Sequence, residues 1–142
     1  MSATEQVYEG SCHCGRVRYR AVGPWGFMEH CHCTDCQKSH GAAFATYIQL
    51  PRARFTLLRG EEQLRVYEAK SGAKRSFCRT CGSCITSGAD SEPESVYVAA
   101  GTLDTPPAPS SEIHIFVRSK APWYEIKDAH PQHSTYPETW SE

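Results

Sequence analysis

The sequence lacks any long hydrophobic run, and no stretch approaches the roughly 20 consecutive apolar residues that a membrane-spanning helix needs. Its first six residues, MSATEQ, contain neither the basic start nor the apolar segment of a secretory signal. We therefore expect a cytoplasmic protein that does not insert into a membrane.

No charge of one sign dominates the chain. Fifteen Lys and Arg residues oppose 16 Asp and Glu residues, which gives a formal net charge of -1. Such a chain has no overall field that would draw it to nucleic acid or to an anionic membrane. We expect no nucleic-acid partner, and any anionic ligand must be recognised by local groups.

Sustained helical periodicity is also missing, whereas short alternating segments separated by turn residues are frequent. The clearest is 16–21, in which Val17, Tyr19 and Ala21 are expected to face a core while the intervening arginines face solvent. Further strands are predicted at 43–50, 54–59, 63–69, 73–78, 95–100 and 112–118. The sequence thus predicts a mostly β protein.

One short helix is predicted at 34–40, with Thr34 as its N-cap and Asp35 in its first turn. A chain of 142 residues is long enough for one ordinary domain with its own core. We assign that domain to residues 1–127. Residues 128–142 are rich in Pro, His, Ser and Thr, and are predicted to be a tail that lies over the surface or is partly disordered.

The chain has eight cysteines, and in a reducing compartment metal binding explains them better than disulfides do. Seven fall into three groups: Cys12 and Cys14; Cys31, Cys33 and Cys36; Cys78 and Cys81. A structural zinc needs four protein ligands and a reactive zinc needs three, so the outer pairs could form one site and the central group the other. The sequence alone leaves this pairing open, because Cys84 could complete either set. We interpret Cys84 as a small packing residue.

Histidines are interspersed among the cysteines, but none is assigned as a ligand. His13 and His32 lie between two cysteines, where their side chains would point away from a metal. His30 and His40 flank the central group and could support it or transfer a proton. No catalytic acid or base is assigned. Iron–sulfur, zinc-deaminase and zinc-finger patterns are incomplete, and no βαβ pattern accompanies Cys33-Thr-Asp-Cys36 as a redox pair would require.

Three motifs surround the cysteines: Gly-Ser-Cys-His-Cys-Gly at 10–15, Cys-His-Cys-x-x-Cys-x-Lys-x-x-Gly at 31–41, and Arg-x-Phe-Cys-x-x-Cys-Gly at 75–82. Together they resemble the glutathione-dependent formaldehyde-activating enzyme and centromere protein V family. The similarity extends from Val7 to Ile126. It implies a β-tent fold of small antiparallel sheets with zinc knuckles. It also implies a structural zinc on Cys12, Cys14, Cys78 and Cys81, and a labile second zinc on Cys31, Cys33 and Cys36.

The ligand chemistry of the second site favours thiol activation. Three thiolates overcompensate the charge of Zn²⁺, so the metal is a weak Lewis acid for water but a suitable partner for a fourth thiolate. Together with the resemblance, this indicates a carbon–sulfur lyase of the S-hydroxymethylglutathione synthase type, with glutathione and formaldehyde or another small aldehyde as partners. Lys38 and the Lys74–Arg75 pair are candidates for binding the carboxylates of glutathione. The alternative is a non-catalytic zinc-binding module, either a metal or thiol sensor or a protein-interaction domain.

Overall fold

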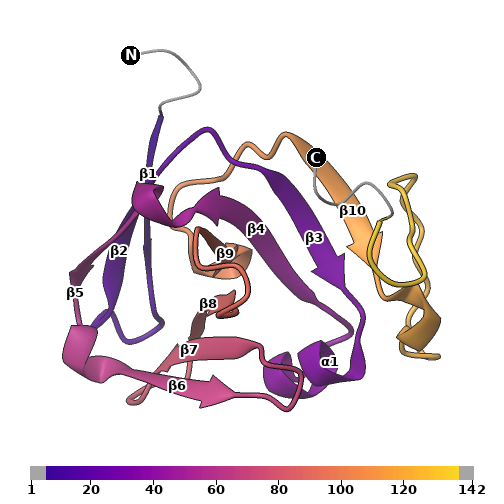
Figure 1. The fold of residues 1–142 in the computed structure, drawn as a ribbon, viewed down its shortest axis with the longest axis horizontal. Helices are drawn as coiled ribbons and strands as arrows, with labels where there is room; N and C mark the ends of the chain where they lie inside the picture. The colour runs from indigo at the N-terminus through magenta and orange to yellow at the C-terminus, as the bar shows by residue number, and fades with distance from the viewer. Residues whose placement is uncertain (1–5, 138–142) are drawn as a thin grey trace.

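In the computed structural model, which describes residues 6–137, the strands form two sheets (Figure 1). The smaller sheet is antiparallel and has the order β1-β2-β5, with β1 at Val7–Ser11, β2 at Arg18–Val22 and β5 at Phe55–Arg59. Val17, Tyr19 and Ala21 are buried and Arg20 is exposed, which confirms the predicted faces of this segment. The ring of Tyr19 stacks on Phe55, and this contact joins β2 to β5 in the core.

The larger sheet has seven strands in the order β10-β3-β4-β9-β8-β7-β6. Its strands are β3 Phe27–Cys31, β4 Ala45–Pro51, β6 Leu64–Glu68, β7 Lys74–Cys78, β8 Cys84–Gly88, β9 Ser95–Ala99 and β10 Ser111–Ile115. All neighbours are antiparallel except β10 and β3, which run side by side in the same direction (Figure 1). Residues 100–110 connect β9 in the middle of the sheet to β10 at its edge. The larger sheet is therefore mixed at this edge, whereas the resemblance implied small antiparallel sheets. The prediction of a mostly β protein is confirmed.

Three strands were not predicted from the sequence: β1, β3 and β8. In β3 the alternation is reversed from what hydrophobicity suggests, because Glu29 is buried while Phe27 and Met28 are only partly buried. The segment predicted at 112–118 ends earlier than expected. Phe116 adopts a left-handed conformation with φ of 55°, and a 3₁₀ helix follows at Val117–Ser119.

The single α-helix among the described residues, α1 at Thr34–His40, has the predicted limits. Its N-cap is Cys33 and not Thr34. Cys33 has an extended backbone, and its Sγ accepts a hydrogen bond from the Cys36 amide at 3.3 Å. A cysteine thus replaces the hydroxyl that normally satisfies the first free amides of a helix. No helix within residues 6–137 is long and apolar enough to cross a membrane.

The buried side chains form two clusters, and each contains part of one cysteine group. Cys12 and Cys78 belong to the larger cluster, which also includes Tyr19 and Ile48. Cys31 and Cys36 belong to the smaller cluster. The cysteines are therefore placed by the packing of the core and not by exposed loops alone.

The C-terminal segment is bound to the far edge of the larger sheet, beside β10 (Figure 1). His114 donates its amide hydrogen to the carbonyl of Pro131 at 2.9 Å and accepts from the amide of His133 at 3.0 Å. The amide of Phe116 donates a hydrogen bond to the carbonyl of Thr135 at 3.2 Å. Residues 131–135 of the predicted tail are thus held beside β10 and the turn after it by backbone hydrogen bonds. Residues 138–142 of that tail lie outside the described residues.

Candidate metal centres

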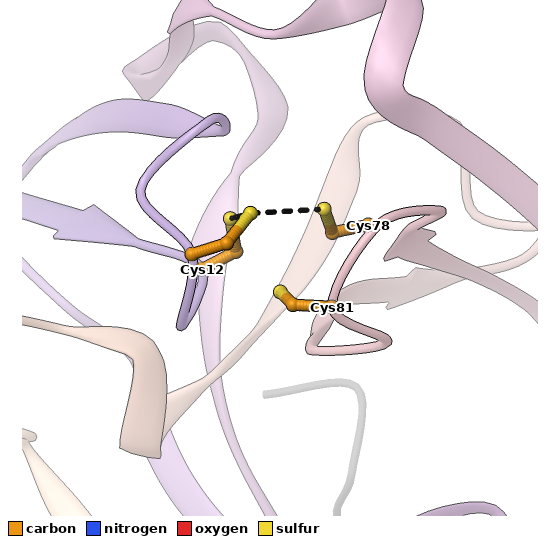
Figure 2. Close-up of side chains that lie close together, drawn as sticks. Cys12, Cys78 and Cys81 are labelled. Atoms are coloured by element: carbon orange, nitrogen blue, oxygen red, sulfur yellow. Dashed lines mark hydrogen bonds between the residues drawn. The ribbon is translucent and has the colours of Figure 1, made fainter.

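The first cysteine group joins the two sheets. Cys12 and Cys14 follow β1, Cys78 ends β7, and Cys81 lies in the turn before β8. Their Sγ atoms all lie within 4.8 Å of one another, with Cys12 and Cys14 separated by 3.6 Å and Cys14 and Cys78 by 3.8 Å. Zinc–sulfur bonds of about 2.3 Å in a tetrahedron place sulfurs about 3.8 Å apart. The four sulfurs thus fit a tetrahedral zinc, and Figure 2 shows those of Cys12, Cys78 and Cys81 pointing toward one another.

Two glycines shape the turns that carry these cysteines. Gly15 follows Cys14 with φ of 82°, and Gly82 follows Cys81 with φ of 81°. Both values lie in the left-handed region, where glycine has no steric penalty. The tight turns bring each pair of sulfurs to one side and direct amides at them, as in the hydrogen bond from the Val17 amide to Cys12 Sγ at 3.3 Å.

Ser83 links the two turns and stabilises a thiolate. Its Oγ accepts a hydrogen bond from the His13 amide at 2.9 Å and lies 3.3 Å from Cys81 Sγ. Burial opposes ionisation of Cys81, but donation from the Ser83 hydroxyl and amide lowers its pKa to about 5. The contacts of Cys81 therefore favour the thiolate form that a metal ligand requires.

The second group, Cys31, Cys33 and Cys36, lies where β3 passes into α1. The Sγ atoms lie within 4.8 Å of one another, and Cys31 and Cys33 are 3.5 Å apart. Within residues 6–137 no fourth Cys, His, Asp or Glu belongs to this group. Hydrogen bonds from the thiols of Cys31 and Cys36 lower the pKa of Cys33 to about 2, while donation to its neighbours and burial raise the pKa of Cys31. This set could hold a metal with one coordination position left for a ligand.

A buried cation faces the second group. Arg75 on β7 is 7% exposed, and its Nη2 donates to Cys36 Sγ at 3.8 Å. Of the cations considered for glutathione, it is the one that lines this site. Lys74 pairs with Asp90 at 3.0 Å and lines a different cavity, and Lys38 is exposed outside the lining.

A cavity of about 280 Å³ opens over Cys31, Cys33 and Cys36. Its lining includes Glu29, which is 7% exposed and whose Oε2 has no hydrogen-bond partner among the described residues. Burial, together with the charges of Glu92 and Cys33, raises the pKa of Glu29 to about 8. Sequence reasoning missed this residue, because a lone Glu in the short segment Phe-Met-Glu-His-Cys carries no motif.

His30 and His32 do not belong to this cysteine group and make hydrogen bonds to other residues. Nε2 of His32 forms a hydrogen bond with Nδ1 of His114 at 2.8 Å, and Nε2 of His114 forms one with Oδ2 of Asp128 at 2.9 Å. His30 contacts Thr46 and Glu112 instead. These bonds tie β3 to β10 and to the C-terminal segment, and so support the loop that carries Cys31 and Cys33.

Two further residues can be placed relative to the cysteine groups. Nε2 of His40 lies 2.9 Å from the hydroxyl of Tyr47, a residue of the cavity lining. Cys84 belongs to neither group, and its thiol donates to the carbonyl of Ser39 at 3.9 Å. Burial raises the pKa of Cys84 and so keeps it protonated.

Comparison with known proteins agrees with this arrangement. A protein of Halomonas elongata, named as a candidate glutathione-dependent formaldehyde-activating enzyme, is 32% identical over 128 residues, which cover 85% of this chain and 82% of the relative. An uncharacterized lyase of Schizosaccharomyces pombe is 26% identical over 78 residues, which cover 55% of each chain.

A solved structure and a family match extend the comparison. The crystal structure of a Rhodobacter sphaeroides protein superposes with a TM-score of 0.57 at 28% identity, and covers 68% of this chain and 87% of its own. The sequence model of the glutathione-dependent formaldehyde-activating enzyme family matches residues 7–119, a span that contains both cysteine groups. The chain belongs to the glutathione-dependent formaldehyde-activating enzyme family.

Proposed function

We propose that this protein is a zinc-dependent carbon–sulfur lyase that activates a thiol for reversible addition to formaldehyde or another small aldehyde. Cys12, Cys14, Cys78 and Cys81 would hold a structural zinc. Cys31, Cys33 and Cys36 would hold a second zinc with an open position. The observation that carries the proposal is this three-cysteine group beneath a cavity large enough for a small ligand.

A zinc bound by three thiolates supplies a soft Lewis acid that favours the thiolate form of an incoming thiol. In the overall addition, the thiol sulfur forms a bond to the aldehyde carbon, the carbon–oxygen double bond becomes a single bond, and the proton of the thiol ends on the oxygen. The product with glutathione and formaldehyde is S-hydroxymethylglutathione. The reverse reaction breaks the same carbon–sulfur bond.

The chain's own residues suit this reaction electrostatically. Three thiolates and one Zn²⁺ sum to a formal charge of -1, which would repel an incoming thiolate. The buried guanidinium of Arg75, at 3.8 Å from Cys36 Sγ, offsets that charge. Tyr47, Tyr97 and Phe116 line the cavity and add aromatic surface beside the cysteines. A reducing, cytoplasmic setting would keep the cysteines, all of which are free in the structure, available as ligands.

The test combines a metal count with a rate measurement. Purified protein should contain close to two zinc ions per chain and should accelerate formation of S-hydroxymethylglutathione, followed by NMR. Cys36→Ser should lose the second zinc and the acceleration. Cys84→Ser, which changes a cysteine of neither group, should retain both.

Two zinc ions without any acceleration of aldehyde addition by the unchanged protein, either with glutathione or with another small thiol, would reject the lyase assignment. That result would favour the non-catalytic zinc-binding module.

A further inference from the structure

The cavity over the second cysteine group is richer in carboxyl groups than a site for an anionic ligand should be. Glu29, Asp35 and Glu92 line it, whereas Arg75 is the one Lys or Arg side chain among its described lining residues. Arg75 already contacts Cys36. The cavity therefore offers negative charge to a ligand and has little positive charge left to give.

Among the acidic residues of the lining, Glu29 is also buried. Its side chain lines the cavity, is 7% exposed, and leaves Oε2 without a hydrogen-bond partner among residues 6–137. A buried carboxyl group without a partner is unfavourable unless a donor or a cation meets it. A ligand with such a group would complete this part of the structure.

Glu92 adds a second carboxyl group to the same lining. Oε2 of Glu92 accepts a hydrogen bond from the Tyr97 hydroxyl at 3.0 Å. That bond orients Glu92 within the lining. Two neighbouring carboxyl groups beside the cysteines are suited to an ammonium group, which has three donors and a localised positive charge.

Given the proposed function, on which this inference rests, we propose that the thiol bound in this cavity is an aminothiol. Its sulfur lies at Cys31, Cys33 and Cys36, and its ammonium group lies between Glu29 and Glu92. Glutathione also has an ammonium group, but its two carboxylates would meet three carboxyl groups and one guanidinium. A small thiol that carries an ammonium group and no surplus carboxylate is the better match.

The experiment measures dissociation constants at pH 7 by calorimetry on zinc-loaded protein. The probes are three thiols of similar length: cysteamine, which carries an ammonium group; 2-mercaptoethanol, which is neutral; and 3-mercaptopropionate, which is anionic. Cysteamine should bind about tenfold more tightly than 2-mercaptoethanol, because hydrogen bonds to a charged group exceed those to a neutral one. 3-Mercaptopropionate should bind most weakly.

Variants separate this effect from the intrinsic reactivity of each thiol. Glu92→Gln keeps the shape of the side chain but removes its charge, and Glu29→Gln replaces the carboxyl oxygen that has no partner with part of an amide group. Each variant should reduce the preference for cysteamine over 2-mercaptoethanol. Glu94→Gln is the matched control, since Glu94 is exposed and outside the lining, and should preserve the preference. If Glu29→Gln does not fold, Glu92→Gln alone decides.

The outcomes separate this inference from the proposed function. Equal affinity for cysteamine and 2-mercaptoethanol, or a preference unchanged in both Gln variants, would overturn the aminothiol assignment while leaving the thiol site. Absence of binding by all three thiols, and by glutathione, would overturn the thiol site and this inference together.

Discussion

At the scale of single residues, the two cysteine groups differ in what their loss should do. Cys78 and Cys81 join β7 and β8 to the loop after β1, so their sulfurs connect both sheets. Structural zinc contributes on the order of 10 kcal/mol to folding in small domains, which is comparable to the whole stability of a protein of this size.

We therefore expect Cys81→Ser to be unfolded or insoluble at neutral pH, as measured by circular dichroism and zinc content. Cys36→Ser should retain its secondary structure while losing one zinc, because α1 and β3 are also held by backbone pairing. A cooperatively folded Cys81→Ser protein with two zinc ions would show that the first group is not structural.

Asp128 gives a pH-dependent prediction. Its hydrogen bond with His114 lowers its pKa from the ordinary value of 3.8. A carboxyl group with a depressed pKa in the folded state stabilises the protein above its unfolded pKa, and this contribution is lost as the pH falls through the folded pKa.

Asp128→Asn should therefore lower stability at neutral pH and weaken its dependence on pH below 3.8, as measured by urea denaturation across the acid range. Asp90→Asn is a control at an exposed ion pair and should change stability less. If the stability of Asp128→Asn falls with decreasing pH as steeply as that of the unchanged protein, the contact with His114 does not contribute to stability.

The cysteine sets could be grouped from sequence because their spacing within each motif is short. Two pairs and one triplet follow directly from the positions of the residues along the chain. Glu29 and the chain of contacts from His32 to Asp128 could not be predicted in this way, since His32 and His114 are 82 positions apart and meet only through the pairing of β3 with β10.

At the scale of elements, the turn after each cysteine pair determines whether two sulfurs point the same way. Gly82 has φ of 81°, and a Cβ added there would meet nothing within 4 Å. Its substitution would therefore act through backbone strain alone.

Gly82→Ala should cost about 1–2 kcal/mol, the penalty for an L-residue in the left-handed region. It should also lower zinc retention, measured by chelator competition. Gly101→Ala is the matched control, because Gly101 also has open space around it but no left-handed backbone. Equal losses in both variants would argue against a role for the turn geometry.

The sequence pattern predicted β2 and most strands of the larger sheet within a few residues. In β2 the reason is the alternation of buried and more exposed side chains, whereas β6 was predicted although none of its residues is buried. The pattern failed for β3, whose buried Glu29 and half-buried His30 serve the site and its support. The predicted final strand also continued beyond Ile115, whereas β10 ends there because Phe116 adopts a left-handed backbone conformation. Departures from a simple pattern thus lie close to the candidate site.

At the scale of the whole molecule, each of the two buried clusters contains cysteines of a different group. The larger cluster includes Cys12 and Cys78 and spans both sheets. The smaller one includes Cys31 and Cys36 beside the open cavity. Loss of each of the two proposed zinc ions should therefore have a different consequence for the fold.

Titration with a zinc chelator should remove one equivalent without change in far-ultraviolet circular dichroism, and the second together with cooperative unfolding. Thiol binding should disappear with the first equivalent. Simultaneous release of both equivalents, with unfolding throughout, would contradict the division into a labile and a structural site.

The path of the C-terminal segment has a practical consequence. Hydrogen bonds from residues 131–135 hold it along β10, and Tyr136 reaches the lining of the cavity. A ligand in the cavity should therefore change the environment of the Tyr136 ring, which also contacts Phe116 edge-on at 4.9 Å between ring centroids. The NMR signals of Tyr136 would then serve as a built-in reporter of ligand occupancy.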